Sequence, residues 1–387
     1  MPPTSPEDAV THPDRTAADR CPGVLRLIEA ADGHLARVRL PGGFVTADQL
    51  RTLAALAGEI GDGRVELTSR ANLQLRALPG DAAARLTDAL TAVDLLPSLD
   101  HDRVRNVLAS PLAGLDGGPD LAPTVAALDT GLCARPRLAG LPGRFLFAID
   151  DGRGAVASLG ADVTAVIRED SASVNGLAVE STELAVESTE VADVMLAFAE
   201  AFLDERAAQG SAAWRLADLP SGTEHVRTVV AKRLDLTTAD DLPDTAPPAR
   251  PVGAIGNHVV LLAPLGRLTV EQLRWVADRV TGRPVRITPW RSVVLPDQAD
   301  ATETLNRAAA NGFGTDNRSP WLRVTACAGQ PGCANALADV QADAAGLAAR
   351  WPDRIVHVSG CGRHCGRPAA TEIDVTATSE GYQVDGV

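Results

Sequence analysis

The chain has 387 residues, of which 45% are hydrophobic, and a formal net charge of −14. This length and apolar content are enough for two or three hydrophobic cores of ordinary size, so we expect a soluble globular protein. Such an acidic surface repels nucleic acid and anionic membranes over most of its area, which argues against both as partners.

The first 20 residues contain no apolar stretch that could form the core of a signal peptide. No later segment approaches the roughly 20 apolar residues that a membrane span requires. We therefore expect a cytoplasmic protein that begins with a disordered arm over residues 1–20.

An internal repeat follows this arm. Residues 37–75 and 260–295 read in phase, apart from a three-residue difference in the second loop, and each copy has the order strand, helix, strand. Each copy has too few strands to cover its own helix. We therefore expect the two halves to complete one shared sheet in a pseudo-two-fold molecule.

A capping box predicts where the helix begins in each copy, at Thr46-x-x-Gln49 and at Thr269-x-x-Gln272. Apolar residues at helical spacing then give each helix one face to bury. These residues are Leu50, Leu53, Ala54, Ala57 and Ile60 in the first helix, and Leu273, Val276, Ala277 and Val280 in the second.

Residues 100–235, between the two copies, read as a second α+β unit. It contains an apolar strand candidate at 144–150, a turn at 151–154 and a helical pattern at 191–208. Residues 177–190 repeat one heptad twice, which is too short for a coiled coil, so we interpret it as a neutral duplication in a loop or edge. Residues 236–251 are rich in Pro, Asp and Thr and suit a linker.

The last unit, residues 319–387, carries four of the six cysteines. Cys327 and Cys333 form a C-x5-C pair, and Cys361 and Cys365 form a C-x3-C pair 27 residues later. Structural zinc usually takes tighter C-x2-4-C hairpins, whereas a [4Fe–4S] cluster takes one thiolate per iron, so these spacings favour the cluster. Flanking glycines would let backbone amides approach its sulfides: Gly329, Gly332, Gly360, Gly362 and Gly366. Cys21 and Cys133 stand alone and are interpreted as ordinary residues.

Together with the duplicated half-domains, this cysteine layout resembles the nitrite/sulfite reductase superfamily, whose members bind siroheme and a [4Fe–4S] cluster. The resemblance covers nearly the whole chain from about residue 21. It implies an α+β, pseudo-two-fold architecture with ferredoxin-like half-domains at 21–80 and 252–300 and two larger α+β units at 100–235 and 319–387. The last unit would hold the cluster.

Within that superfamily the chain is similar to the precorrin-3B synthases of aerobic cobalamin biosynthesis. The similarity lies in the short length, the stretch ACAGxPGC at 326–333 and the stretch HVSGC-x3-C at 357–365. It implies an O2-dependent monooxygenase that converts precorrin-3A to precorrin-3B, by hydroxylating a meso carbon and forming a lactone.

Two departures separate the chain from siroheme reductases. Their second cysteine motif usually reads GCPNSC, and here Gly362 and Arg363 replace the Pro and Asn. Their basic LPRKFK segment reads LPGRFL here, which keeps one cation at Arg144 and places Leu146 at the other position. Losing a charge-assisted hydrogen bond costs about 1.5–3 kcal/mol, so the site is poorly built for sulfite.

A precorrin carries eight carboxylates, and arginines are the side chains best suited to pair with them. Arg70, Arg105 and Arg291 match superfamily positions that contact the macrocycle, and Arg144 would join them in orienting the carboxylates. Asn72, Gln74 and Asn106 could add neutral donors. A single arginine is usually a surface salt bridge, but arginines repeated on strands of both halves indicate one central pocket.

No G-x-G-x-x-G follows a strand, so we expect electrons from an external donor, either a ferredoxin or an NAD(P)H-dependent reductase. The iron that activates O2 is not identified, and a further non-haem iron is one candidate. No side chain is assigned a catalytic role. Two alternatives stay open: a siroheme-dependent sulfite or nitrite reductase, in which Cys365 would bridge cluster and siroheme, and a non-enzymatic iron–sulfur electron carrier.

Overall fold

The computed structural model describes residues 19, 21–179, 187–239, 251–280 and 282–386. The predicted N-terminal arm lies almost wholly outside these residues, as do the middle of the tandem heptad and most of the predicted linker. Among the described residues, no helix is long and apolar enough to cross a membrane.

The two halves of the repeat form two five-stranded antiparallel sheets. In order across the first sheet, the strands are β1 (Ile28–Ala30), β2 (Gly33–Val38), β5 (Leu73–Leu78), β4 (Arg64–Leu67) and β13 (Arg267–Thr269). The second sheet has the order β11 (Gly253–Ile255), β12 (His258–Leu262), β15 (Ser292–Leu295), β14 (Val285–Ile287) and β3 (Phe44–Val45). The last strand of each sheet therefore comes from the other copy.

The prediction of one shared sheet is wrong, and the turns before β3 and β13 give the physical reason. Residues Pro41–Gly43 and Pro264–Gly266 form 3-10 turns with left-handed backbone, which redirect the chain away from its own sheet. A Cβ on Gly43 would lie 2.1 Å from the Ile287 carbonyl oxygen, so only glycine permits this approach to the other half. Two sheets that exchange one strand each are the result.

The helices of the two copies pack against each other in one common core. They are α1 (Ala47–Ile60) and α6 (Val270–Ala277), and each begins with the predicted capping box. Their predicted apolar faces are buried, although Ile60 is only partly covered and Val280 lies beyond the end of α6. Two further helices follow the sheets, α2 (Ala82–Thr91) and α7 (Ala301–Ala310).

The third unit has a mixed sheet with helices packed against it. Its strands, in order, are β10 (Leu177–Val179), β9 (Ala172–Val174), β8 (Val163–Ile167), β7 (Phe147–Asp150) and β6 (Val107–Ala109). Its helices are α3 (Ala122–Cys133), α4 (Ser188–Ala208) and α5 (Gly222–Leu234). The strand predicted within residues 144–150 is β7, and the helical pattern predicted at residues 191–208 lies within α4, so both predictions are confirmed.

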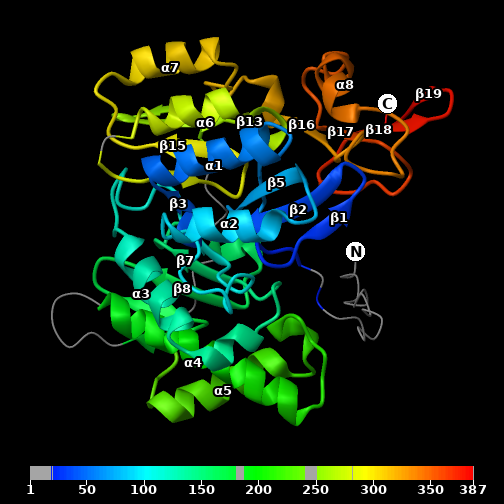
Figure 1. Cartoon of the computed structure of the whole chain (residues 1–387). Coiled ribbons are helices and arrows are strands. Elements are labelled where there is room, and N and C mark those ends of the chain that lie inside the picture. The colour runs from blue at the N-terminus through cyan, green and yellow to red at the C-terminus, as the bar shows by residue number, and fades with distance from the viewer. Residues whose placement is uncertain (1–18, 20, 180–186, 240–250, 281, 387) are drawn as a thin grey trace, which may run out of the picture.

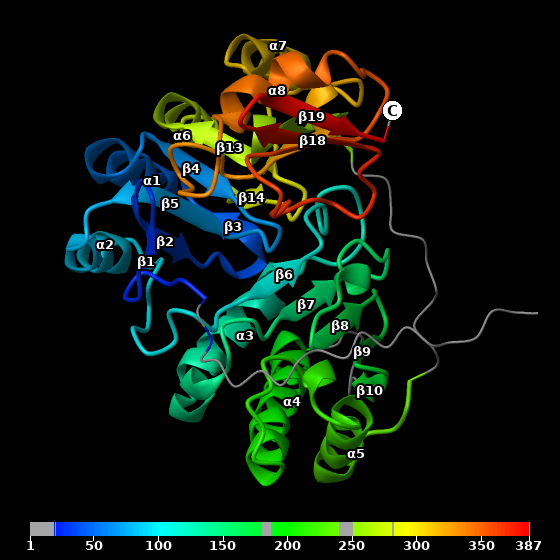
Figure 2. The ribbon, with the colours of Figure 1, turned by 90° about the vertical axis from the view of Figure 1, so that its right-hand side faces the viewer.

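The fourth unit is a small sheet with one helix. It contains β16 (Val324–Ala326), β17 (Val356–Ser359), β18 (Ile373–Thr378), β19 (Gly381–Asp385) and α8 (Val340–Ala348). The first three strands are parallel and β19 is antiparallel. In Figure 1 this unit lies beside the two half-domains, while α3, α4 and α5 form the opposite end of the molecule. Figure 2 shows β6, β7 and β8 side by side below the half-domains.

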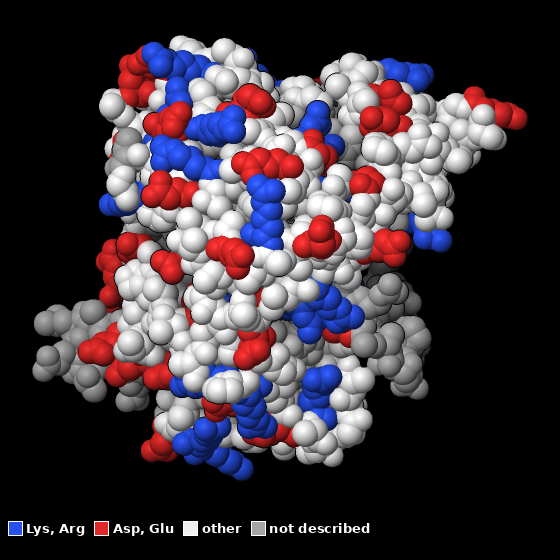
Figure 3. All heavy atoms as spheres, in the orientation of Figure 1, with Lys and Arg blue, Asp and Glu red and all other residues white. Residues whose placement is uncertain are grey.

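The predicted α+β, pseudo-two-fold architecture is thus confirmed, apart from the division into two sheets. The face shown in Figure 3 carries Lys and Arg side chains interspersed with Asp and Glu, without a large area of one sign.

Candidate functional site

The first cysteine of each motif follows one of two adjacent parallel strands. Cys327 comes directly after β16, and Cys361 follows β17 after one glycine. Ala326 and Val358 are paired across these strands, so both cysteines leave the same edge of the sheet. The Gly360 amide donates a hydrogen bond to Cys327 Sγ at 3.1 Å. The register of the sheet therefore brings the two motifs together.

The loop that carries Cys333 is held against the second motif. The Ala336 amide donates to the Cys333 carbonyl at 3.0 Å, and the Leu337 amide donates to the Gly360 carbonyl at 2.8 Å. A Cβ on Gly360 would lie 2.7 Å from Ala336 Cβ, so the contact requires glycine. Three of the four cysteines are partly buried in this region, and Cys365 is exposed.

Buried polar side chains lie close to these loops on β17. His357 is fully buried, and its Nδ1 lies 2.8 Å from Thr325 Oγ1. Burial lowers the pKa of His357 to about 4, although the charge of Asp374 and the backbone of Cys365 act in the opposite direction. Ser359 is also fully buried, and its hydroxyl has no hydrogen-bond partner among the described residues.

Four free cysteines on two adjacent loops have the donor chemistry that an iron–sulfur cluster requires. A cubane cluster binds one thiolate per iron and therefore takes four more widely spaced sulfurs. Four free cysteines on two glycine-containing loops, with an unpartnered buried hydroxyl beside them, are consistent with that larger group. The four ligands remain an assignment from sequence.

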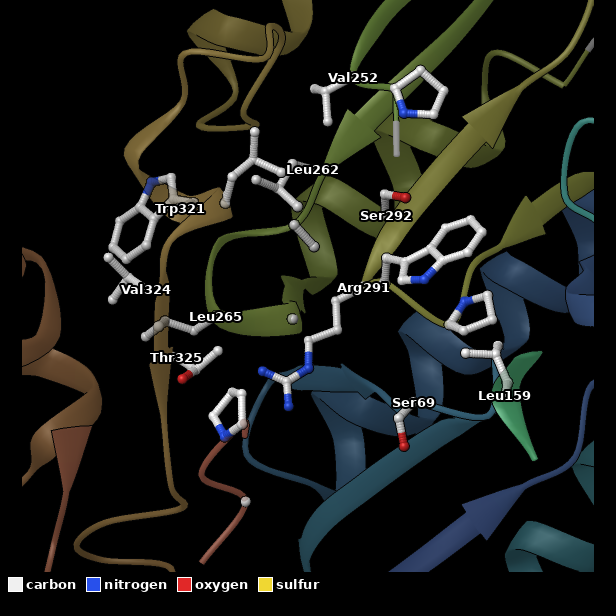
Figure 4. Close-up of a pocket in the computed structure, with 18 residues that line it drawn as sticks. Ser69, Leu159, Val252, Leu262, Leu265, Arg291, Ser292, Trp321, Val324 and Thr325 are labelled. Atoms are coloured by element: carbon white, nitrogen blue, oxygen red, sulfur yellow. The ribbon is translucent and has the colours of Figure 1, made fainter. Parts of the chain in front are cut away.

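A cavity of about 490 Å³ lies between the second sheet and the cysteine-bearing unit. Its wall includes Ser69 from the turn after β4, the equivalent turn after β14, and Gly366 and Pro368 beside Cys365. Figure 4 shows the Arg291 side chain extending into this space between Thr325 and Ser69. Burial lowers the pKa of Arg291, which the charge of Glu66 opposes. A carboxylate on a ligand would favour the charged guanidinium here.

Further guanidinium groups gather where the first sheet meets the third unit. Arg70 donates to the Gly143 carbonyl at 3.5 Å, and Arg144 lies 5.0 Å from the centre of the Trp214 ring. Burial lowers the pKa of Arg70, and the positive charge of Arg215 lowers it further. Arginines that lower one another's pKa are stabilised when an anion binds among them.

Two arginines that the sequence reading missed belong to this group. Arg37, on β2, donates to Gln74 Oε1 at 2.9 Å, while its Nε has no partner among the described residues. Arg39 is 2% exposed, and its Nε and Nη1 are likewise unpartnered within the described chain. Burial and the charge of Arg37 lower the pKa of Arg39 to about 9. The one sequence feature that could have identified these two arginines is the alternation R-x-R-L at residues 37–40, in the first repeat copy.

Arg105 does not face the cavity. Its Nε and Nη2 each donate to Asp129 at 2.7 Å, and its Nη1 donates to the Leu95 carbonyl at 2.9 Å. The side chain is almost fully buried against α3. These bonds occupy all three nitrogens, so the structure gives Arg105 an internal pairing role in place of the expected contact with a ligand.

The expected repetition of arginines at equivalent positions is also wrong. Ala71 and Arg291 are the left-handed residues of the two equivalent turns, with φ of 54° and 61°. The amide of each residue donates a hydrogen bond to the carbonyl of the threonine three residues earlier. The residue equivalent to Arg70 is therefore Trp290. The two arginines are one position out of register, and an ungapped alignment of the two turns from Thr68 and Thr288 already shows this offset.

The neutral donors predicted for a ligand are engaged within the protein. Asn72 accepts from the Leu40 amide and donates to Asn106, and Asn106 donates to the Gly143 carbonyl at 3.0 Å. Gln74 accepts from Arg37 and donates to Glu66 at 2.6 Å. These amides connect the first sheet to the third unit and fix the guanidinium groups around them.

Comparisons with known proteins agree with this fold. Residues 28–93 match the family model of the nitrite/sulfite reductase ferredoxin-like half domain. The chain is 25% identical to a precorrin-3B synthase from a Sinorhizobium species over 94% of this chain and 81% of that protein. It is 28% identical to a ferredoxin–nitrite reductase of Synechococcus elongatus, over 91% of this chain and 78% of the other.

Among solved structures, the NirA protein of Mycobacterium tuberculosis superimposes with a TM-score of 0.71 at 22% identity. The match covers 91% of this chain and 73% of that one. At this identity the likeness shows the fold. The resemblance predicted from the cysteine layout and the duplicated half-domains is confirmed at the level of the superfamily.

Proposed function

Since the chain is a member of the nitrite/sulfite reductase superfamily, we propose that it is an oxidoreductase of the precorrin-3B synthase type. Its substrate would be precorrin-3A, and its product a hydroxylated lactone formed with O2 and electrons from an external donor. The Sinorhizobium relative supports this choice by its name and by its coverage of most of both chains.

The observation that carries the proposal is the placement of the cations: one arginine enters a cavity that borders the cysteine unit, and others gather where the first sheet meets the third unit. Arg291 enters the cavity from the second sheet, and Arg37, Arg70 and Arg144 gather at the first sheet and the third unit. A polycarboxylate macrocycle needs cations spread over a wide area, whereas a small oxyanion needs them at one point. Leu146, in contrast, is buried in an apolar cluster and offers no second cation beside Arg144.

The chain's own residues would bind and orient the substrate. The arginines would pair with its carboxylates, and the Trp321, Leu262 and Leu265 side chains give the cavity an apolar wall that excludes water. Cys327, Cys333, Cys361 and Cys365 would hold the [4Fe–4S] cluster, which supplies electron transfer when bound. Gly366 and Pro368 place the second cysteine loop at the wall of the cavity, so electron donor and substrate would lie close together.

A siroheme-dependent nitrite or sulfite reductase is the second candidate. It is favoured by the Synechococcus relative and by the neighbouring cations Arg37 and Arg144, which could hold a small anion. A non-enzymatic electron carrier is the third, and the convergence of unpartnered guanidinium nitrogens argues against it.

The test is the absorption spectrum and iron content of protein purified without oxygen, followed by addition of precorrin-3A, an electron donor and air. A broad iron–sulfur spectrum without porphyrinoid bands, together with a hydroxylated lactone product, is expected. Intense siroheme bands in the isolated protein would instead favour the reductase. Protein that contains cluster but neither binds nor converts the tetrapyrrole would favour the carrier.

A further inference from the structure

A row of charged side chains crosses the first sheet where it meets the cysteine-bearing unit. Glu66 on β4 lies between Arg76 on β5 and Arg267 on β13. Its Oε1 is 4.0 Å from Arg76 Nε and 3.7 Å from Arg267 Nε. Because β5, β4 and β13 are neighbours in the sheet, the row spans three strands, and the third strand comes from the other half.

Arg76 reaches directly to the loop of the first cysteine motif. Its Nε and Nη2 each donate to an Asp32 oxygen at 3.1 Å, and Nη2 also donates to the Gly332 carbonyl at 2.7 Å. Both charged side chains are about nine-tenths buried. A Cβ on Gly332 would lie 2.7 Å from the same Nη2, so a side chain at this position would displace the guanidinium group. Gly332 immediately precedes Cys333.

Arg267 reaches the same motif through one intermediate side chain. It donates to Asp62 at 2.7 Å and to the side-chain oxygen of Gln341, on α8. Gln341 in turn donates from Nε2 to the Cys327 carbonyl at 3.1 Å. Both ends of the first cysteine motif are thus bonded to side chains that the first sheet holds in place.

The row also connects to the guanidinium group at the third unit. Glu66 accepts from Gln74 Nε2 at 2.6 Å, and Gln74 accepts from Arg37 at 2.9 Å. One continuous set of polar contacts therefore joins Arg37, which we propose binds a substrate carboxylate, to the cysteine loop.

We propose that Arg76 is a positioning residue for the iron–sulfur cluster and raises its reduction potential, with Arg267 and Gln341 in a supporting role. The inference rests on the proposed function, because it requires the cluster. Reduction adds one electron and breaks no bond, so it adds negative charge beside the Gly332–Cys333 peptide. A buried guanidinium bonded to that peptide stabilises the reduced state more than the oxidised state.

The test compares Arg76→Gln with Arg85→Gln as the matched control. Arg85 is in the same half-domain and pairs with Glu59, but both of these side chains are more than half exposed. Iron and sulfide content and the midpoint potential, from a titration followed by electron paramagnetic resonance, are measured on anaerobically purified protein. We expect Arg76→Gln to lower the potential and Arg85→Gln to leave it unchanged. A tenfold loss in stabilisation of the reduced state corresponds to about 59 mV for a one-electron couple.

Arg76→Lys keeps the charge but cannot reproduce the three bonds of the guanidinium, so it should retain most of the potential and lose cluster faster in air. If Arg76→Gln does not fold, Gln341→Leu removes the donor to the Cys327 carbonyl and should likewise speed cluster loss. Wild-type protein without iron and sulfide would refute the proposed function. If the wild type contains the cluster, and Arg76→Gln has the same midpoint potential and loses its cluster at the same rate as the wild type, this inference alone is refuted.

Discussion

Replacing Asp129 with alanine tests whether Arg105 is an internal structural residue. The variant leaves a guanidinium that is 3% exposed without either of its bonds to the carboxylate, and only the Leu95 carbonyl remains as a partner. Removing one partner of a buried ion pair typically costs ~3–5 kcal/mol. Because the Asp129 side chain is 19% exposed, water can replace part of the lost interaction. We therefore expect the free energy of unfolding to fall by about 3 kcal/mol.

The assay is differential scanning calorimetry together with tetrapyrrole binding. A loss of this size should lower the midpoint of the transition that contains the third unit by roughly 10 °C. The double variant Arg105→Leu/Asp129→Leu should recover most of that loss, because two apolar side chains can replace a buried pair. Arg137→Ala, which breaks the exposed pair with Asp204, is the control and should cost less than about 1 kcal/mol. An unchanged midpoint in Asp129→Ala, with weaker binding of the tetrapyrrole, would show that Arg105 serves the ligand and that our reasoning is wrong.

The other predictions concern the cavity and the cysteines. Arg291→Ala should weaken tetrapyrrole binding at least tenfold and leave the cluster absorption intact, because it loses one charge-assisted hydrogen bond worth about 1.5–3 kcal/mol. A fluorescence titration that gives the variant the affinity of the wild type would contradict this prediction. Cys327→Ser should abolish the visible cluster absorption whereas Cys133→Ser retains it, and full absorption in Cys327→Ser would overturn the ligand assignment. Gly360→Ala should lower the iron content, because its new methyl group would meet Ala336 at 2.7 Å, and wild-type iron content would show that the loop can yield.

Local signals in the sequence predicted local structure well. The two capping boxes gave the starts of α1 and α6, and the apolar spacing gave their buried faces. The exchange of β3 and β13 could not be predicted in this way, since strand pairing depends on where the Pro41–Gly43 turn sends the chain in space. Periodicity and capping are properties of neighbouring residues, whereas sheet membership is decided by distant ones.

The same distinction between neighbouring and distant residues applies to the candidate site. The cysteine spacings indicated one common site, and the parallel register of β16 and β17 explains how the two motifs meet. For arginines, the residue type alone did not distinguish a ligand contact from an internal pair. Arg105 has an acidic partner 24 positions later on α3, and Arg37 faces Gln74 only because β2 and β5 are neighbours. Such partners are visible only once the strands are placed.

The exchange of strands has a consequence for the biosynthesis of this chain. Glu66 and its neighbours on β4 pair with residues 267–269, so this edge of the first sheet stays open until the second repeat copy has been synthesised. An exposed strand edge invites pairing with other chains, and contacts between residues so distant in sequence form slowly. A fragment that ends in the linker would therefore keep an unfinished sheet, and the first half-domain cannot be expressed alone as a faithful copy of its form in the whole protein.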